Sequence, residues 1–226
     1  MRGGRRNLVV TVAAVLFAVS GATAVAVAFA AQKHAPQPPA SAAGALGPSA
    51  APSVTLSSPD PWPTIVGPVL PSSRPVSINI PAIGVHSVVQ YLGLTAQNTL
   101  QVPAPGPRYN EAAWYKYSST PGALGPAVIL GHVDSAAQGP SVFFNLGDLQ
   151  PGDKVLITRA DDLVAVFKID GVRVYAKNHF PTKLVYANTD HAALRLITCG
   201  GPFDNATGHY LDNIVVYASL AGSHLA

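Results

Sequence analysis

Cysteine and charge are both scarce in this sequence of 226 residues. The single cysteine, Cys199, excludes a disulfide within the chain and a zinc site built from thiolates alone. The sequence has neither a His-x-x-x-His pair nor a cluster of acidic ligands, so we expect no metal and no other cofactor. Charged residues make up only 11% of the chain and its mean hydropathy is +0.27, which favours a protein with a membrane segment.

The positive charge of the chain, +3 overall with a pI of about 9.1, is concentrated in its N-terminal third. Before residue 75 a single acid, Asp60, faces five bases: Arg2, Arg5, Arg6, Lys33 and Arg74. From Pro75 onward, nine Lys and Arg residues are balanced by ten Asp and Glu residues. The folded part is therefore near neutral and lacks the basic stripe that a phosphate backbone selects, so no nucleic acid partner is expected.

An uncharged run from Leu8 to Ala31 follows the basic residues 1–7. As a helix its 24 residues span ~36 Å, more than the ~30 Å hydrocarbon core of a bilayer. Because basic residues stay on the cytoplasmic side, we predict a single-pass plasma-membrane anchor at residues 8–31, with the N-terminus inside and the remainder outside. A cleaved signal peptide is the alternative, since Ala-x-Ala patterns recur between Ala22 and Ala30, although its apolar core is normally only ~7–15 residues.

Residues 32–74 contain ten of the 21 prolines, and Ala, Ser and Gly fill most of the rest. Such a composition buries too little apolar surface to offset its ordering entropy, so we predict an extended, partly polyproline linker. Within it, residues 59–71 are apolar enough to lie against the folded part instead. The folded domain is predicted at residues 75–221, followed by a short tail at residues 222–226.

Short β-branched and aromatic runs separated by turn signals fill the last two thirds of the chain. Gly147-Asp148, Pro151-Gly152-Asp153 and Asp170-Gly171 predict turns. No long stretch has a helical period, although residues 109–118 and 189–193 are compatible with short helices. This pattern predicts a mainly β fold, a closed or partly closed barrel. Strands are expected at residues 76–80, 127–130, 154–158, 163–169, 171–175, 194–198 and 214–217.

Cys199 ends one of the predicted strands and is followed by Gly200 and Gly201. Alternation along the strand places Arg195, Ile197 and Cys199 on one face. A cysteine beside flexible backbone is open to a substrate, and its thiolate is a strong nucleophile. A lone cysteine is equally compatible with a buried structural thiol or an intermolecular bridge, and free cysteines are among the most buried residues. Position alone leaves these interpretations open.

His132 ends another apolar run, Val128 to Leu130, and follows Gly131. The other six histidines lie in terminal, turn-like or polar segments. His132 is therefore the best candidate for an acid/base partner of the cysteine.

These two strand ends resemble motifs of the sortase family of cysteine transpeptidases. Leu196-Ile197-Thr198-Cys199 is similar to the Leu-x-Thr-Cys signature that closes the seventh strand of the sortase barrel, and Leu130-Gly131-His132 is similar to the family's Gly-His element. Their order and their separation of 67 residues also fit, and the resemblance extends from about residue 75 to residue 221. It implies a closed, sortase-like β-barrel of seven to eight strands with short helices. Further motifs resemble the actinobacterial class F subgroup: residues 80–85, 131–135, 142–144 and 199–204 through Asn213.

The resemblance implies that Cys199 is the nucleophile and that His132 is the general acid and base. Sortases also use an arginine on the strand after the cysteine loop. Here no arginine follows Cys199, and Asn213 stands where the arginine is expected. Arg195, on the same strand face as Cys199, is the candidate for a charged stabiliser of the oxyanion, unless it only forms an ordinary salt bridge.

Three further residues are expected to support the reaction. Asn213 is a neutral alternative as a donor to the oxyanion. Asp134 orients His132 or lies in a surface turn, and Thr198 precedes the nucleophile in the motif.

A membrane-anchored, extracellular transpeptidase is the activity that the resemblance implies. Its partners are surface proteins with a C-terminal Leu-Pro-x-Thr-Gly-like sorting signal, cleaved between Thr and Gly, and an amine acceptor such as a peptidoglycan precursor. Some sortases bind calcium, but no carboxylate cluster is evident here. The alternatives are a sortase-like pseudoenzyme, a tethered β module without activity, and a cysteine L,D-transpeptidase. The last of these has a His-Ser-Gly motif just before its cysteine, and residues 194–198 of this chain do not contain that motif.

Overall fold

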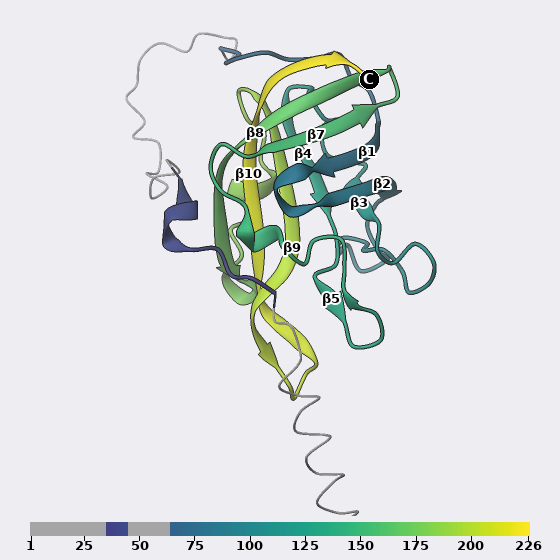
Figure 1. Ribbon diagram of the computed structural model, residues 1–226, viewed down its shortest axis with the longest axis vertical. Coiled ribbons are helices and arrows are strands. Elements are labelled where there is room, and N and C mark those ends of the chain that lie inside the picture. Colours follow the sequence, from purple (N-terminus) through teal and green to yellow (C-terminus); the bar gives the residue numbers. More distant parts are fainter. Residues whose placement is uncertain (1–34, 45–63) are drawn as a thin grey trace, which may run out of the picture. The chain divides into compact units, whose positions relative to one another are not determined.

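The computed structural model describes residues 35–44 and 64–226, and the anchor predicted at residues 8–31 lies outside them. Eight strands form a closed barrel in the order β1-β2-β3-β4-β9-β10-β8-β7 (Figure 1). This confirms the prediction of a mainly β, closed-barrel fold. Helical structure in the described ranges consists of one short α-helix and four 3₁₀ turns.

The barrel strands are β1 (Pro75–Ile80), β2 (Val85–Leu92), β3 (Ala112–Tyr115), β4 (Gly125–Leu130), β7 (Lys154–Arg159), β8 (Leu163–Ala176), β9 (Ala192–Asp204) and β10 (His209–Leu225). A separate two-stranded ribbon consists of β5 (Asp134–Ser135) and β6 (Gly139–Pro140). The helical elements are η1 (Ala40–Ala43), η2 (Pro81–Ile83), η3 (Leu146–Asp148), η4 (Lys177–His179) and α2 (Thr182–Tyr186).

Strands β4 and β9 are parallel neighbours, as are β2 and β3, whereas the other neighbouring barrel strands are antiparallel. In the β4–β9 pair Leu130 lies opposite Ile197. Both strands run in the same direction, so they reach the same end of the barrel. The residues that follow this pair, Gly131 and Thr198, therefore come to lie side by side.

Two apolar clusters cover the two faces of these central strands. Ile129, Leu196 and Ile214 are among the fully buried side chains of the barrel interior. Residues of the opposite parity, such as Leu130 and Ile197, face outward and form the second cluster with Val185 of α2. Because both faces are covered, most of β9 is buried without alternation.

The turn predicted at Asp170-Gly171 is wrong, because these residues lie inside the single long strand β8. The register against β10 shifts there, from Gly171 opposite Tyr217 to Ile169 opposite Ala218. This shift leaves Asp170 as the extra residue of a β-bulge. Its carboxylate accepts a hydrogen bond from the hydroxyl of Ser219 at 2.7 Å. A turn-forming sequence thus bends the strand without ending it.

The short helices predicted at residues 109–118 and 189–193 are also absent. Residues 112–115 form β3, which pairs with both β2 and β4, and residue 192 already begins β9. Gly200 and Gly201 do not end β9, which continues to Asp204 in a hairpin with β10. Gly201 instead adopts a left-handed φ of +73° close to a register shift, where a side chain would clash with the carboxylate of Asp212.

Residues 35–44 pack against the barrel, which differs from the extended linker predicted for residues 32–74. Ala42 of η1 is fully buried in the core, and Ala35 is 5% exposed. The carbonyl oxygen of Pro36 lies where a side chain on Gly147 would stand, so the two backbones approach closely. Alanine loses no rotamer entropy on burial, so an Ala-rich segment can dock despite its low hydrophobicity.

Residues 64–74 run along the barrel mainly through backbone hydrogen bonds. The N–H of Val66 donates to the carbonyl of Asp190 at 2.8 Å, and the N–H of Leu70 donates to the carbonyl of Gly122 at 2.7 Å. The side chains of Ile65 and Val66 stay about half exposed, at 51% and 55%. Ile65 and Val66 therefore lie against the domain by their backbone, whereas the side chain of Leu70 is partly buried against the core.

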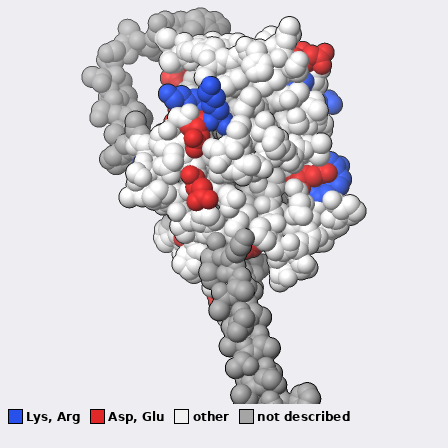
Figure 2. Space-filling model, in the orientation of Figure 1, with Lys and Arg blue, Asp and Glu red and all other residues white. Residues whose placement is uncertain are grey.

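The surface of the described part carries few charges. Figure 2 shows small groups of acidic and basic side chains scattered over a face that is otherwise uncharged. Residues 35–44 and 64–226 contain no helix long and apolar enough to cross a membrane.

Arg159, at the end of β7, is the largest fully buried side chain of the described residues and is 1% exposed. Its guanidinium donates to the carbonyls of Pro121 at 2.6 Å and Pro71 at 2.7 Å, and to both carboxylate oxygens of Asp161. One side chain thus ties the segment that enters β1 to the turn before β4. Removing its charged partner would leave a buried cation without compensation.

Stability is expected to depend on pH through this ion pair. The hydrogen bond from Arg159 lowers the pKa of Asp161 from 3.8 to about 2. The ion pair therefore stabilises the fold fully at pH values above 3.8, the pKa of Asp161 in the unfolded chain, and this stabilisation is lost as the pH falls towards about 2. We expect Asp161→Asn to lower the free energy of unfolding at neutral pH, and the gap to wild type to shrink between about pH 4 and pH 2. Urea unfolding across this range measures it, with Asp162→Asn as the control. A gap that did not change with pH would contradict the prediction.

Candidate active site

Two hydrogen bonds join the end of β4 to β9 beyond the last pair of the two strands, Leu130 and Ile197. The N–H of Gly131 donates to the carbonyl of Ile197 at 3.1 Å, and the hydroxyl of Thr198 donates to the carbonyl of Gly131 at 2.9 Å. Thr198, which the sequence places before the cysteine, is buried and bonds β9 to the end of β4. His132 and Cys199 are the residues that directly follow Gly131 and Thr198.

Cys199 is half-buried and faces outward from the barrel, on the same side of β9 as Ile197. It packs against a small apolar cluster that contains Val133 and Phe144. Its neighbour on β10 is Asn213, so both side chains stand on one face about 5 Å apart at Cβ. The sulfur accepts a hydrogen bond from the ammonium group of Lys177 at 3.4 Å. The thiol therefore lies between an apolar wall and two polar neighbours.

The loop before β3 holds the side chain of His132 in place. Its Nε2 is 2.8 Å from the carbonyl oxygen of Pro103, and its ring stacks on Tyr109 at 4.1 Å between centroids. A carbonyl oxygen only accepts hydrogen bonds, so this contact assigns a proton to Nε2. In neutral His132 the other nitrogen, Nδ1, is then the one free to accept a proton.

Asp134 does not bond to His132 directly. Its carboxylate accepts a hydrogen bond from the hydroxyl of Tyr210 at 2.6 Å, and its backbone carbonyl accepts one from Tyr109 at 3.0 Å. Burial, reinforced by the bond to Asp134, raises the pKa of Tyr210 well above its usual range. Asp134 thus acts on His132 only through Tyr109, the residue on which the imidazole stacks.

Arg195 shares the outward face of β9 with Cys199 but lies four residues earlier, ~13 Å along the strand. Its guanidinium stacks over the ring of Tyr217, with 4.5 Å between Cζ and the ring centroid, and donates to the carbonyl of Leu194 at 3.1 Å. Arg195 is 6% exposed, and this burial lowers its pKa. The structure therefore does not bring Arg195 together with Cys199 and His132.

Residues 35–37 lie beside the cysteine. Ala35 belongs to the cluster that contacts Cys199, and the side-chain oxygen of Gln37 accepts a hydrogen bond from the N–H of Gly201 at 3.1 Å. The backbone just after the candidate nucleophile is thus occupied by the chain's own N-terminal segment.

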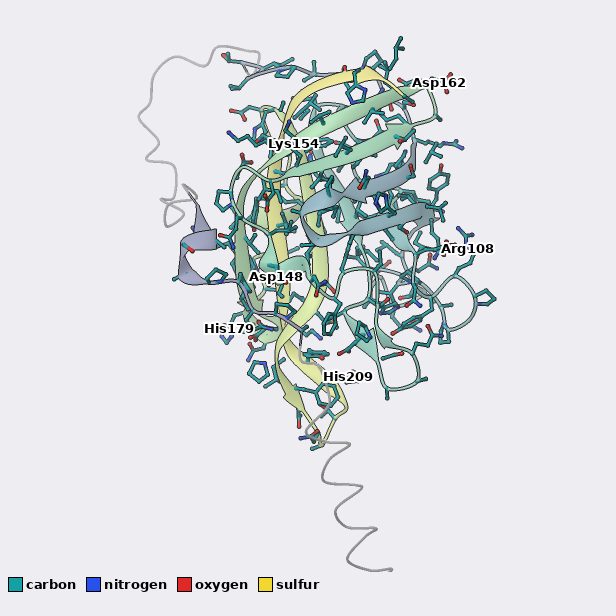
Figure 3. The ribbon with its side chains drawn as sticks, in the orientation of Figure 1. Arg108, Asp148, Lys154, Asp162, His179 and His209 are labelled. Atoms are coloured by element: carbon teal, nitrogen blue, oxygen red, sulfur yellow. The ribbon has the colours of Figure 1, made fainter. Side chains whose placement is uncertain are left out.

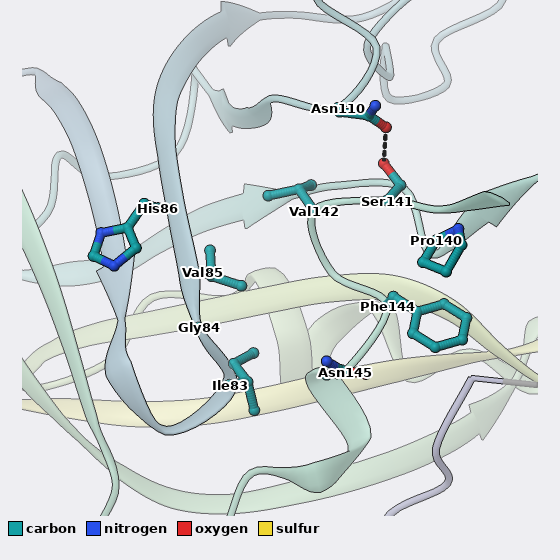
Figure 4. Close-up of a pocket in the computed structure, with 10 residues that line it drawn as sticks. All are labelled: Ile83, Gly84, Val85, His86, Asn110, Pro140, Ser141, Val142, Phe144 and Asn145. Carbon is teal, nitrogen blue, oxygen red and sulfur yellow. Dashed lines mark hydrogen bonds between the residues drawn. The ribbon is translucent and has the colours of Figure 1, made fainter. Parts of the chain in front are cut away.

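A cavity of about 340 Å³ lies beyond this cluster, between η2, the start of β2 and the segment after β6 (Figure 4). Asn110 and Ser141 are joined across its rim by a 2.8 Å hydrogen bond. Phe144 lines the cavity and also belongs to the cluster at Cys199, but neither Cys199 nor His132 lines it. Cys199 and His132 therefore lie outside this cavity. In the described ranges no group of three or more His, Cys, Asp or Glu side chains could hold a metal ion.

Three residues that the sequence did not indicate contact the predicted pair or the backbone beside it: Lys177, Tyr109 and Gln37. Lys177 follows β8 directly, and a strand predicted to its true end at Ala176 would have indicated which way Lys177 points. Tyr109 and Gln37 lie in segments without periodicity, and no comparable pattern indicates their positions.

Residues 78–221, more than half of the chain, match the family model of the sortase domain. The chain belongs to the sortase family. Sortases are cysteine transpeptidases that act on surface proteins with a sorting signal and on amine acceptors. A search of curated proteins finds no match.

Solved structures of sortases share this fold. Sortase A from Corynebacterium diphtheriae is 23% identical with a TM-score of 0.50, and the match covers 66% of this chain and 62% of that one. The pilus-related sortase C of Group B Streptococcus is 18% identical with a TM-score of 0.50, covering 68% and 70% of the two chains. Sortase A of Listeria monocytogenes is 16% identical with a TM-score of 0.49, covering 67% and 90%.

Proposed function

We propose that this sortase cleaves a Leu-Pro-x-Thr-Gly-like sorting signal between Thr and Gly and transfers the acyl group to an amine of a cell-wall precursor. The observation that supports the proposal most strongly is that Cys199 and His132 directly follow Thr198 and Gly131, two residues that a hydrogen bond joins between β9 and β4. A nucleophile and a proton-transfer group so placed are the two parts that covalent acyl transfer requires.

The chemistry proceeds in two stages. The Cys199 thiolate attacks the threonine carbonyl, and the C–N bond to glycine breaks as His132 protonates the departing amine, leaving a thioacyl-enzyme. His132 then takes a proton from the incoming amine, which attacks the thioester and releases the thiolate. Nδ1 of His132 is the nitrogen that transfers the proton, because Nε2 is engaged by the carbonyl of Pro103.

The negative oxygen that forms in each stage needs preorganised donors. Backbone N–H groups near Cys199 and the side chain of Asn213, opposite Cys199 on β10, are suitable by position. The role of Arg195 as a charged donor stays a prediction, which its contacts with Tyr217 and Leu194 do not favour. A folded Arg195→Met variant with full turnover would exclude it, whereas a fall of about 10²–10³-fold would support it.

We further propose that the enzyme belongs to the class F subgroup and works outside the plasma membrane, anchored by residues 8–31. The motifs at residues 131–135 and 199–204 support the subgroup, and the basic residues before an uncharged run support the anchor. Surface proteins that carry the sorting signal would then be its substrates.

A peptide library that varies the residues around Thr-Gly tests the proposed function. The full-length protein is incubated with the library and hydroxylamine, and mass spectrometry detects threonine hydroxamates. We expect hydroxamates from Leu-Pro-x-Thr-Gly-like members. If Cys199 reacts with alkylating agents but no library member is cleaved, the protein is instead a sortase-like pseudoenzyme or a tethered binding module.

A further inference from the structure

The hydrogen bond from Lys177 to the sulfur of Cys199, at 3.4 Å, has no part in the proposed chemistry so far. In the described part of the chain it is the one hydrogen bond that reaches this sulfur. None of the ion pairs found among the described residues includes Lys177, so no carboxylate there neutralises its charge. A cation is thus directed at the candidate nucleophile.

The fold holds Lys177 in this position through three neighbouring strands. Ala176, the last residue of β8, lies opposite Asp212 and has an extended backbone. Alternation therefore turns Lys177 to the same face as Tyr175, which pairs with Asn213 of β10, the neighbour of Cys199. Figure 3 labels His179, two residues further on, near the end of the barrel from which the β9–β10 hairpin extends.

Asn213 separates the two groups along this face. Two strand spacings, ~10 Å, lie between the backbones of β8 and β9. The short side chain of Asn213 lets the four-carbon stem of Lys177 pass across β10 and reach the sulfur. A bulky residue at position 213 would stand in that path.

We propose that Lys177 is a catalytic residue whose ammonium group pairs with the Cys199 thiolate and keeps the sulfur in its reactive, ionised form. A neighbouring cation favours the thiolate, and hydrogen bonds to ionised groups are stronger than neutral ones. The thiol proton leaves to His132 or to water, and Lys177 keeps its three protons throughout. The ion pair is present in the free enzyme, without any substrate. This proposal rests on the proposed function only for the identity of the group that the thiolate attacks.

Alkylation by iodoacetamide measures the ion pair without any peptide substrate, and the single cysteine makes the labelled site unambiguous. We expect Lys177→Gln to lower the alkylation rate of the full-length protein at pH 7 by about three- to fivefold, the net of fewer thiolates and a more nucleophilic sulfur. Lys177→Arg keeps the charge and should stay within about twofold of wild type. Lys183→Gln, which removes a charge from the exposed face of nearby α2, should leave the rate unchanged.

Salt separates a charge effect from a packing effect. Raising NaCl from about 0.05 M to about 1 M should slow alkylation of the wild type, because the ion pair is exposed to solvent, but not that of Lys177→Gln. The proposal is overturned if Lys177→Gln reacts as fast as wild type, if Lys177→Arg is as slow as Lys177→Gln, or if both proteins respond equally to salt.

Peptide turnover on the same variants distinguishes this proposal from the proposed function. If Lys177→Gln slows alkylation but the wild type cleaves no Thr-Gly peptide, the ion pair is supported and the assigned substrate is wrong. If the wild type cleaves the peptide but Lys177→Gln is alkylated as fast as the wild type, the proposed function is supported and the ion pair is wrong.

Discussion

Cys199→Ala is expected to abolish formation of the thioacyl-enzyme and to lower turnover of a sorting peptide by at least about 10³-fold. Alanine has no atom that can attack the threonine carbonyl, so the pathway through a covalent intermediate is closed. Intact-protein mass spectrometry detects the acyl adduct on the wild type and its absence on the variant. Hydroxamate release measures the loss of turnover.

The fold should survive this substitution. Cys199 is half-buried, and its hydrogen bond to Lys177 lies at the surface, so removing the sulfur leaves no deeply buried group without a partner. Urea unfolding of Cys199→Ala and wild type checks this. Turnover by Cys199→Ala at the rate of the wild type would refute the assignment of the nucleophile.

His132→Gln is expected to lower turnover by about 10²–10⁴-fold, the usual contribution of a general acid and base. Glutamine has an N–H that can still donate to the carbonyl of Pro103, so the loop before β3 keeps its contact while proton transfer is lost. In His132→Ala, which empties the ring site beside Tyr109, added imidazole should restore part of the turnover.

An exposed histidine provides the matched control. His209→Gln changes the β9–β10 hairpin, where the side chain is exposed, and should leave turnover unchanged (Figure 3). Full turnover by a folded His132→Gln, or the same loss in His209→Gln, would contradict a role for His132 in proton transfer.

The barrel could be predicted because its strands follow from short stretches of sequence. Residues 127–130 and 194–198 are apolar and strand-forming, and both runs lead to a polar residue beside glycine. Their parallel pairing, which the sequence did not indicate, is what brings the two ends together. The family motifs then identified a pair that position alone had left open.

The remainder of the site depends on contacts between residues far apart in the sequence. Lys177 reaches Cys199 across an intervening strand, and Tyr109 meets His132 from a loop with no period. Arg195 was selected because it shares a face with Cys199, but sharing a face says nothing about the ~13 Å that separates residues four apart on a strand. Composition likewise predicted an extended linker where Ala35 and Ala42 are buried.

The contact between Gln37 and the N–H of Gly201 has a consequence for affinity. A ligand that accepts a hydrogen bond from this N–H replaces Gln37, a competitor on the same chain. Displacing it costs the same free energy for every such ligand. The N-terminal segment would then weaken binding uniformly, without altering the preference for one sorting signal over another.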